Sequence, residues 1–92
     1  MELRQKLPRR PKGKDPMIYC HFFTPDSGWD WYVMAWDGKD TLFGLAKGFV
    51  AELGEFSLAE IESVRGGLGL PVERDPYFEP CRLSALEIKL NL

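Results

Sequence analysis

A chain of 92 residues, of which 45% are hydrophobic and 13% aromatic, has the size of one domain and must bury most of its large apolar side chains to offset chain entropy. No apolar run approaches the roughly 18 residues that a membrane-spanning helix needs, so we expect no contact with a membrane. The net charge of −2 is unevenly distributed: residues 1–14 carry six cations and one acid (+5), whereas the other 78 residues carry six cations and 13 acids (−7).

The N-terminus differs from the rest of the chain in composition as well as in charge. We predict that residues 1–16 form a basic, proline-rich N-terminal arm and that residues 17–92 form a single α+β domain. Proline and glycine recur every few residues in the arm, which rules out a continuous helix and favours an extended segment. The basic start lacks the apolar stretch of a secretory signal, which favours the cytoplasm and free thiols at Cys20 and Cys81.

Cations in the arm are the clearest functional signal in the sequence. Closely spaced lysines and arginines neutralise phosphates along a nucleic-acid backbone. The candidate RNA or phosphate contacts are Arg9, Arg10, Lys12 and Lys14. The alternative is a solvated arm that contributes only solubility, and the acidic remainder of the chain argues against general affinity for nucleic acid.

Two strands joined by a turn are predicted directly after the arm. The segments "MIYCHFFT" (17–24) and "WDWYVMAWD" (29–37) are rich in β-branched and aromatic residues, and "PDSG" between them is a turn signal. After a second turn, "DGKD" (37–40), the segment "TLFGLAKGFVAEL" (41–53) is predicted as a third strand, although its glycines weaken the prediction.

A short helix is predicted in "FSLAEIESVRGG" (56–67). Ser57 is the expected N-cap, with Glu60 three residues later completing a capping box, and Gly66 is the expected left-handed C-cap. The tail "RLSALEIKLNL" (82–92) fits either a helix or a strand, and the strand is slightly favoured. The predicted fold is therefore α+β, with an antiparallel sheet of three to five strands and one short helix packed on one face.

The three tryptophans lie close together in one predicted strand, where side chains alternate between the two faces of the sheet. Strict alternation places Trp29, Trp31 and Val33 on one face, which we assign to the core. Tyr32 and Trp36 then share the other face with Asp30 and Met34.

An open sheet face that carries tyrosine, tryptophan and an acid has the composition of a protein–protein interface. The candidate protein-partner contacts are Asp30, Tyr32 and Trp36. The alternative is that residues 66–81 fold across this face and bury it, because small domains rarely leave so much apolar area exposed.

The residues that metal sites and enzymes need are scarce. His21 is the only histidine, and two cysteines cannot complete a zinc site of the usual spacing. Cys20 and His21 are adjacent in a predicted strand, so their side chains point to opposite faces and do not form a nucleophile–base pair. We expect no enzyme, no metal, no cofactor and no small-molecule substrate.

Residues 22–80 resemble a small family of uncharacterised proteins that are carried on plasmids, phages and other mobile elements. The shared features are the Phe-Thr-Pro turn before an aromatic strand, a Phe-Gly-Leu segment, a helix start like "FSLAEI", and "LGLPVERDPYF" (68–78). This resemblance implies a compact α+β domain and a mobile-element origin but no mechanism.

The whole chain, including its opening "MELRQKLPRRPKGKDP", is also similar to phage-encoded anti-CRISPR inhibitors of type I-F CRISPR interference. That resemblance implies a stoichiometric inhibitor in the host bacterial cytoplasm. Its partner would be the type I-F surveillance complex of Cas proteins and guide RNA, and it would block hybridisation of target DNA. The alternative function is that of a mobile-element accessory protein, which binds nucleic acid directly through its basic arm.

Overall fold

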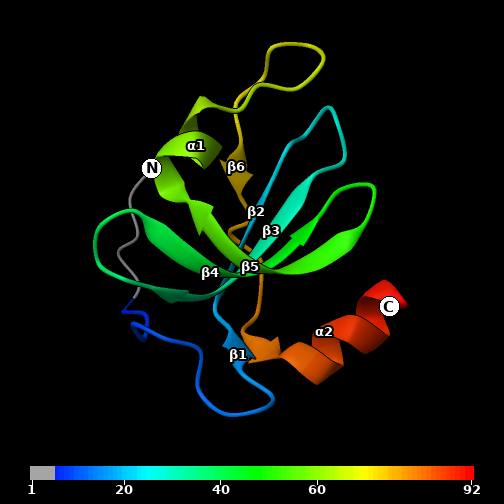
Figure 1. The fold of residues 1–92 in the computed structure, drawn as a ribbon. Coiled ribbons are helices and arrows are strands. Elements are labelled where there is room, and N and C mark those ends of the chain that lie inside the picture. Colours follow the sequence, from blue (N-terminus) through cyan, green and yellow to red (C-terminus); the bar gives the residue numbers. More distant parts are fainter. Residues whose placement is uncertain (1–5) are drawn as a thin grey trace.

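The computed structural model describes residues 6–92, which form two sheets and two helices. The main sheet has five antiparallel strands in the order β5–β4–β3–β2–β6 (Figure 1). Its strands are β2 Cys20–Phe23, β3 Asp30–Trp36, β4 Thr41–Lys47, β5 Ala51–Ser57 and β6 Glu73–Arg74. The remaining elements are strands β1 Met17–Ile18 and β7 Cys81–Arg82, which pair with each other, and helices α1 Leu58–Ser63 and α2 Leu83–Leu90. The predicted α+β fold with an antiparallel sheet is confirmed.

The segment from 41 to 53, predicted as one strand, is in fact two. The chain reverses at residues 48–50, and β4 and β5 pair along their whole length, from Thr41 opposite Ser57 to Lys47 opposite Ala51. Glycine fits at position 48 of this reversal because the Trp29 ring lies against it. A Cβ atom at this position would come within 2.5 Å of that ring.

One face of the main sheet is covered by α1, which begins where it was predicted to begin. The Ser57 hydroxyl accepts a hydrogen bond from the Glu60 amide at 3.2 Å and donates one to Asp40 at 2.5 Å. The helix ends at Ser63, and not at a left-handed Gly66, because Val64 turns to an extended conformation that leads into a bridge between Arg65 and Pro71. We call the buried cluster under α1 the first core: Cys20, Phe22, Trp31, Val33, Leu42, Leu58, Ile61 and Val72.

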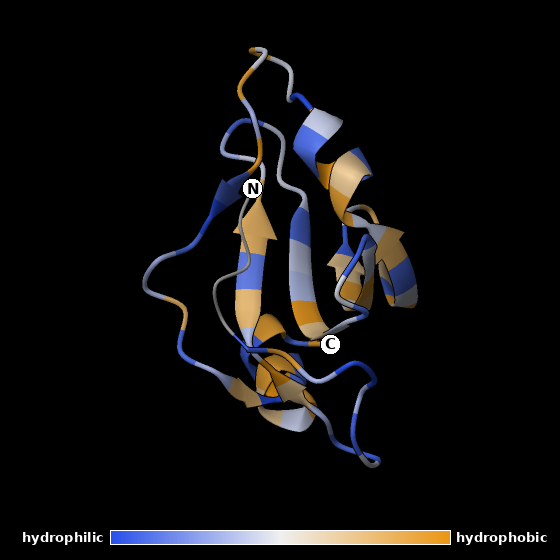
Figure 2. Cartoon of the chain, turned by 90° about the vertical axis from the view of Figure 1, so that its left-hand side faces the viewer, coloured by the Kyte–Doolittle hydropathy of each residue, from blue (hydrophilic) through white to orange (hydrophobic). Residues whose placement is uncertain are grey.

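The other face of the sheet is covered by residues 75–80 and by α2, and it holds a second core made of Ile18, Tyr32, Met34, Leu45, Leu83 and Leu86. The prediction of a strand in the tail is wrong. Residues 83–90 form a helix because Leu83 and Leu86, with Leu90 one turn further on, share the face that packs on the sheet. Figure 2 shows the hydrophobic and hydrophilic residues that alternate along the strands between these layers.

A β-bulge changes which aromatic residues share a face. Val33 pairs with Gly44, but the next pair along is Ala35 with Phe43, so Met34 is an extra residue on β3. Trp36 therefore packs with the first core and not beside Tyr32, which corrects the face predicted from strict alternation.

Trp29 also differs from its prediction, because 38% of the residue is exposed and it does not belong to the first core. It lies just before β3, where the Thr24 hydroxyl accepts a hydrogen bond from its amide at 2.8 Å. Its ring stacks on Trp31 and meets Phe49 edge-on.

Residues 6–16 of the arm lie against the domain, below the sheet in the view of Figure 1, whereas residues 1–5 lie outside the described part of the chain. Leu7 packs on the first core, and the Pro8 carbonyl accepts a hydrogen bond from the Trp36 amide at 2.9 Å. At the other end of the arm, the Asp15 carboxylate accepts hydrogen bonds from the amide and the hydroxyl of Ser84, and thereby caps α2. No helix within residues 6–92 is both long and apolar enough to cross a membrane.

Candidate functional site

The four predicted arm cations lie on the surface of the molecule. Arg9, Arg10, Lys12 and Lys14 are all exposed, in a segment whose backbone is attached to the domain near Pro8 and near Asp15. The arm thus presents its charges from a fixed backbone, which lowers the entropy lost when they contact a partner.

A further cation, which sequence reasoning missed, lies beside the arm. Arg82 and Lys12 line the same hollow of about 220 Å³, between the arm and the β1–β2 segment. The Arg82 guanidinium donates a hydrogen bond to the backbone carbonyl of Asp15 at 3.1 Å. Arg82 is 70 positions from Lys12 in the sequence, and only the pairing of β7 with β1 brings it to the arm.

The three predicted protein contacts do not share one surface. Tyr32 is only 6% exposed and belongs to the second core, so the face around it is not open. The alternative of a covered face is correct, but the cover is formed by residues 75–80 and α2 and not by the whole of residues 66–81, because Val72 packs in the first core. Trp36 is half-buried on the opposite face, where its indole nitrogen has no hydrogen-bond partner among the described residues. Asp30 is partly exposed and contacts His21 instead of lying free.

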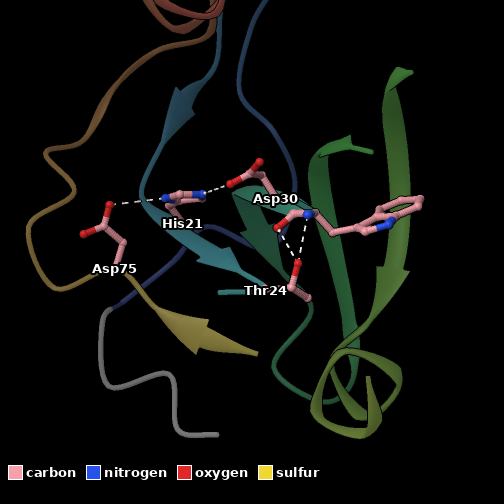
Figure 3. A network of polar contacts seen from close by, with 5 residues as sticks. His21, Thr24, Asp30 and Asp75 are labelled. Atoms are coloured by element: carbon pink, nitrogen blue, oxygen red, sulfur yellow. Dashed lines mark hydrogen bonds and ion pairs between the residues drawn. The ribbon is translucent and has the colours of Figure 1, made fainter. Parts of the chain in front are cut away.

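His21 is the centre of a polar cluster that ties the second face together (Figure 3). Its Nε2 atom lies 2.7 Å from a carboxylate oxygen of Asp30, and its Nδ1 atom lies 3.2 Å from one of Asp75. Its ring stacks on Tyr32 with 4.4 Å between centroids and 5° between planes, and Phe78 lies tilted against both rings.

The charges in this cluster favour a structural role over acid–base chemistry. A neutral imidazole has one N–H group, so only the protonated ring donates to both carboxylates at once. Burial, followed by the nearby Asp30, Asp75 and Cys81, raises the pKa of Tyr32 to about 12. The Tyr77 amide and then His21 lower the pKa of Asp75 below its usual 3.8. Tyr32 is therefore neutral and Asp75 ionised at neutral pH, and the cluster fastens residues 75–78 to the sheet.

The Cys20 thiol and the possible metal ligands also lack the features of a reactive site. Burial raises the pKa of the Cys20 thiol to about 11, against the opposing effect of Arg74, so the thiolate is scarce at neutral pH. Across residues 6–92, no three histidine, cysteine, aspartate or glutamate side chains are grouped so that they could hold a metal ion.

Sequence reasoning assigned His21 a structural role but could not find its partner Asp75, because 54 positions separate the two residues. The only local signal was the position of His21 across a predicted hairpin from Asp30 and Tyr32. In the structure His21 does pair with Tyr32 in the strand register.

The model of a family described as "Protein of unknown function (DUF2958)" matches residues 1–87. The match extends beyond the segment from 22 to 80 and includes both the arm and the first half of α2. No curated protein and no solved structure matches the chain.

Proposed function

This chain belongs to the DUF2958 family, and we propose that it is a non-catalytic anti-CRISPR protein. In this proposal it binds the type I-F surveillance complex of Cas proteins and guide RNA in the host bacterial cytoplasm, and it blocks hybridisation of target DNA. The proposal rests on the resemblance of the whole chain to type I-F inhibitors and on the surface that the arm presents.

The observation that carries the proposal is the exposure of Arg9, Arg10, Lys12 and Lys14 on an anchored arm. A guide RNA that awaits its target presents phosphates along a channel, and cations held in place beside that channel can bind them. The arm backbone is already fixed by the Pro8 and Asp15 contacts, so little order has to be gained on binding.

The acidic remainder of the chain has a complementary role. It carries a charge of −7 outside residues 1–14, and protein surfaces that hold nucleic acid are rich in lysine and arginine. An acidic body would occupy such a surface while the arm contacts RNA. Target DNA would then meet a covered and negatively charged site.

The arm is tested with the double variant Arg9→Ala/Arg10→Ala. The affinity for an intact type I-F complex is measured at several salt concentrations. We expect weaker binding at low salt, and a salt dependence of log K that is shallower by about 1.4 to 2, because two phosphate contacts are lost. The matched control, Lys39→Ala/Lys89→Ala, removes two exposed cations outside the arm and should behave like the wild type. An unchanged affinity and salt dependence for the arm variant would remove the arm from the mechanism.

A second candidate function is favoured by the position of Arg82, which extends the cationic surface beyond the arm. In that alternative, the protein is a mobile-element accessory protein that binds nucleic acid directly. A gel shift with free RNA and free DNA separates the two functions, because only the alternative requires tight binding without any Cas protein.

A further inference from the structure

An apolar groove of about 300 Å³ lies on the second face of the sheet, next to the arm. Its walls include side chains from four elements and from the arm: Met34, Phe43, Leu53, Leu83, Pro11 and Pro16. Leu53 is 61% exposed, whereas Met34 and Leu83 in the floor of the groove are buried, so the groove is open on the β5 side. Exposed leucine at the side of an apolar groove is a feature of interaction surfaces.

The groove continues into the hollow that contains Lys12 and Arg82. Pro16 and Met34 line both spaces, so the two adjoin. Lys14 also lines the groove. One continuous surface therefore offers an apolar site followed by a cationic one.

The cations beside this groove are available to an outside anion. Among residues 6–92, no carboxylate forms an ion pair with Lys12, Lys14 or Arg82. Arg82 donates a hydrogen bond to the backbone carbonyl of Asp15, whose carboxylate is bonded to Ser84 at 2.8 and 2.6 Å. Ser84 is the main cause of the lowered pKa of Asp15, and the charge of Arg82 contributes less.

The geometry points to a docking site for an acidic peptide segment of a partner protein. A bulky apolar side chain of that segment enters the groove, and a neighbouring carboxylate contacts Lys12 and Arg82. The site goes beyond the proposed function, because the apolar groove needs no RNA, although the site shares Lys12 with the proposed phosphate contacts. It also supplies an exposed protein-contact surface, which the buried Tyr32 does not.

A peptide fits this surface better than a nucleotide does. Apart from Lys14, the side chains that wall the groove present hydrocarbon, thioether and ring atoms, so a base placed against them would lose the hydrogen bonds of its polar edge. An aliphatic or aromatic side chain has no such cost. Because the groove is open beside Leu53, it covers only one side of the peptide side chain that enters it. Neighbouring residues of the peptide must therefore supply the remaining contacts.

The test uses the full chain and methyl NMR spectra, with the methyl groups of Met34, Leu53 and Leu83 as reporters. The probes are three capped synthetic peptides at concentrations up to millimolar: acetyl-Asp-Asp-Leu-Asp-Asp-amide, the same peptide with a central serine, and acetyl-Lys-Lys-Leu-Lys-Lys-amide. We expect the acidic leucine peptide to shift all three reporters. The serine peptide should bind about tenfold more weakly, and the basic peptide should leave the reporters unchanged.

Two variants locate the site. Leu53→Ser should weaken binding of the acidic leucine peptide about tenfold, read from the Met34 and Leu83 methyls, whereas Leu68→Ser, at another exposed leucine, should not change it. Both positions are exposed, so the fold is expected to persist, and the unshifted remainder of the spectrum verifies this. The proposal is overturned if the acidic leucine peptide causes no shift or if Leu53→Ser binds it normally. It is equally overturned if oligouridylate displaces the peptide and shifts the same methyls with higher affinity.

Discussion

The two faces of the sheet are closed in different ways. The first core is covered mainly by α1, which begins directly after β5 and is therefore close in sequence to the sheet, with Leu7 and Val72 joining from more distant segments. The second core is covered by segments from both ends of the chain, and polar contacts between distant residues fasten them: Asp15 to Ser84 and His21 to Asp75. Bringing distant segments together costs more chain entropy than packing a helix that directly follows a strand. It also leaves gaps where the segments meet. The groove and the cation-lined hollow lie at those meeting points.

The largest effect is expected from removing a buried side chain under each cover. Ile61 of α1 and Leu86 of α2 are both 2% exposed, and replacing either with alanine should lower the free energy of unfolding by about 3 kcal/mol. Hydrogen exchange should distinguish the two variants. Ile61→Ala is expected to raise exchange throughout the main sheet, whereas Leu86→Ala should raise it most in α2 and the arm. Equal increases at all amides in both variants would contradict the difference between the two faces.

A smaller effect is expected from His21→Phe, which keeps a ring that can stack on Tyr32 but removes the bonds to Asp30 and Asp75. The expected loss of stability is about 2 kcal/mol, because the hydrogen bonding between the ring and these two partly exposed carboxylates is lost. Amides of residues 75–78 should exchange faster, while those of α1 should be unaffected. Thermal unfolding and hydrogen exchange measure the two effects, and unchanged protection at residues 75–78 would show that the His21 cluster does not hold this segment.

Acid should loosen the cover of the second face. Hydrogen bonds from Ser84 lower the pKa of Asp15, and the Tyr77 amide, with His21, lowers that of Asp75. A carboxyl group whose folded pKa is depressed stabilises the fold above its unfolded pKa, and this contribution is lost as the pH falls from about 4 through the folded value. Between pH 5 and pH 2, α2 and residues 75–78 should therefore lose protection. Unchanged protection of both segments down to pH 2 would contradict this role of Asp15 and Asp75.

The local features of the fold could be predicted from the sequence. The Ser57 cap, the hairpin before Trp36 and the antiparallel sheet follow from short-range signals such as capping residues, turns and alternating apolar residues. Exposure of the arm cations was also a prediction that local composition could support, since lysine and arginine in a proline-rich segment rarely become buried.

The remaining features depend on contacts that no local pattern contains. The bulge at Met34 moves Trp36 to the first core, and the periodicity of a strand does not reveal an extra residue. The tail becomes a helix because Leu83 and Leu86 find a face of the sheet to cover and because Asp15 caps its start. His21 contacts Asp75, and Lys12 and Arg82 come to line one hollow, only after the distant segments have packed together.

Capture of labelled target DNA by a purified type I-F surveillance complex tests the proposed inhibition most directly. The complex is incubated first with the wild-type protein, with Arg9→Ala/Arg10→Ala, or with Lys39→Ala/Lys89→Ala. The account predicts that the wild type and the Lys39/Lys89 variant abolish DNA capture, and that the Arg9/Arg10 variant inhibits it much less at low salt. Undiminished capture in the presence of excess wild-type protein would contradict the proposed inhibition.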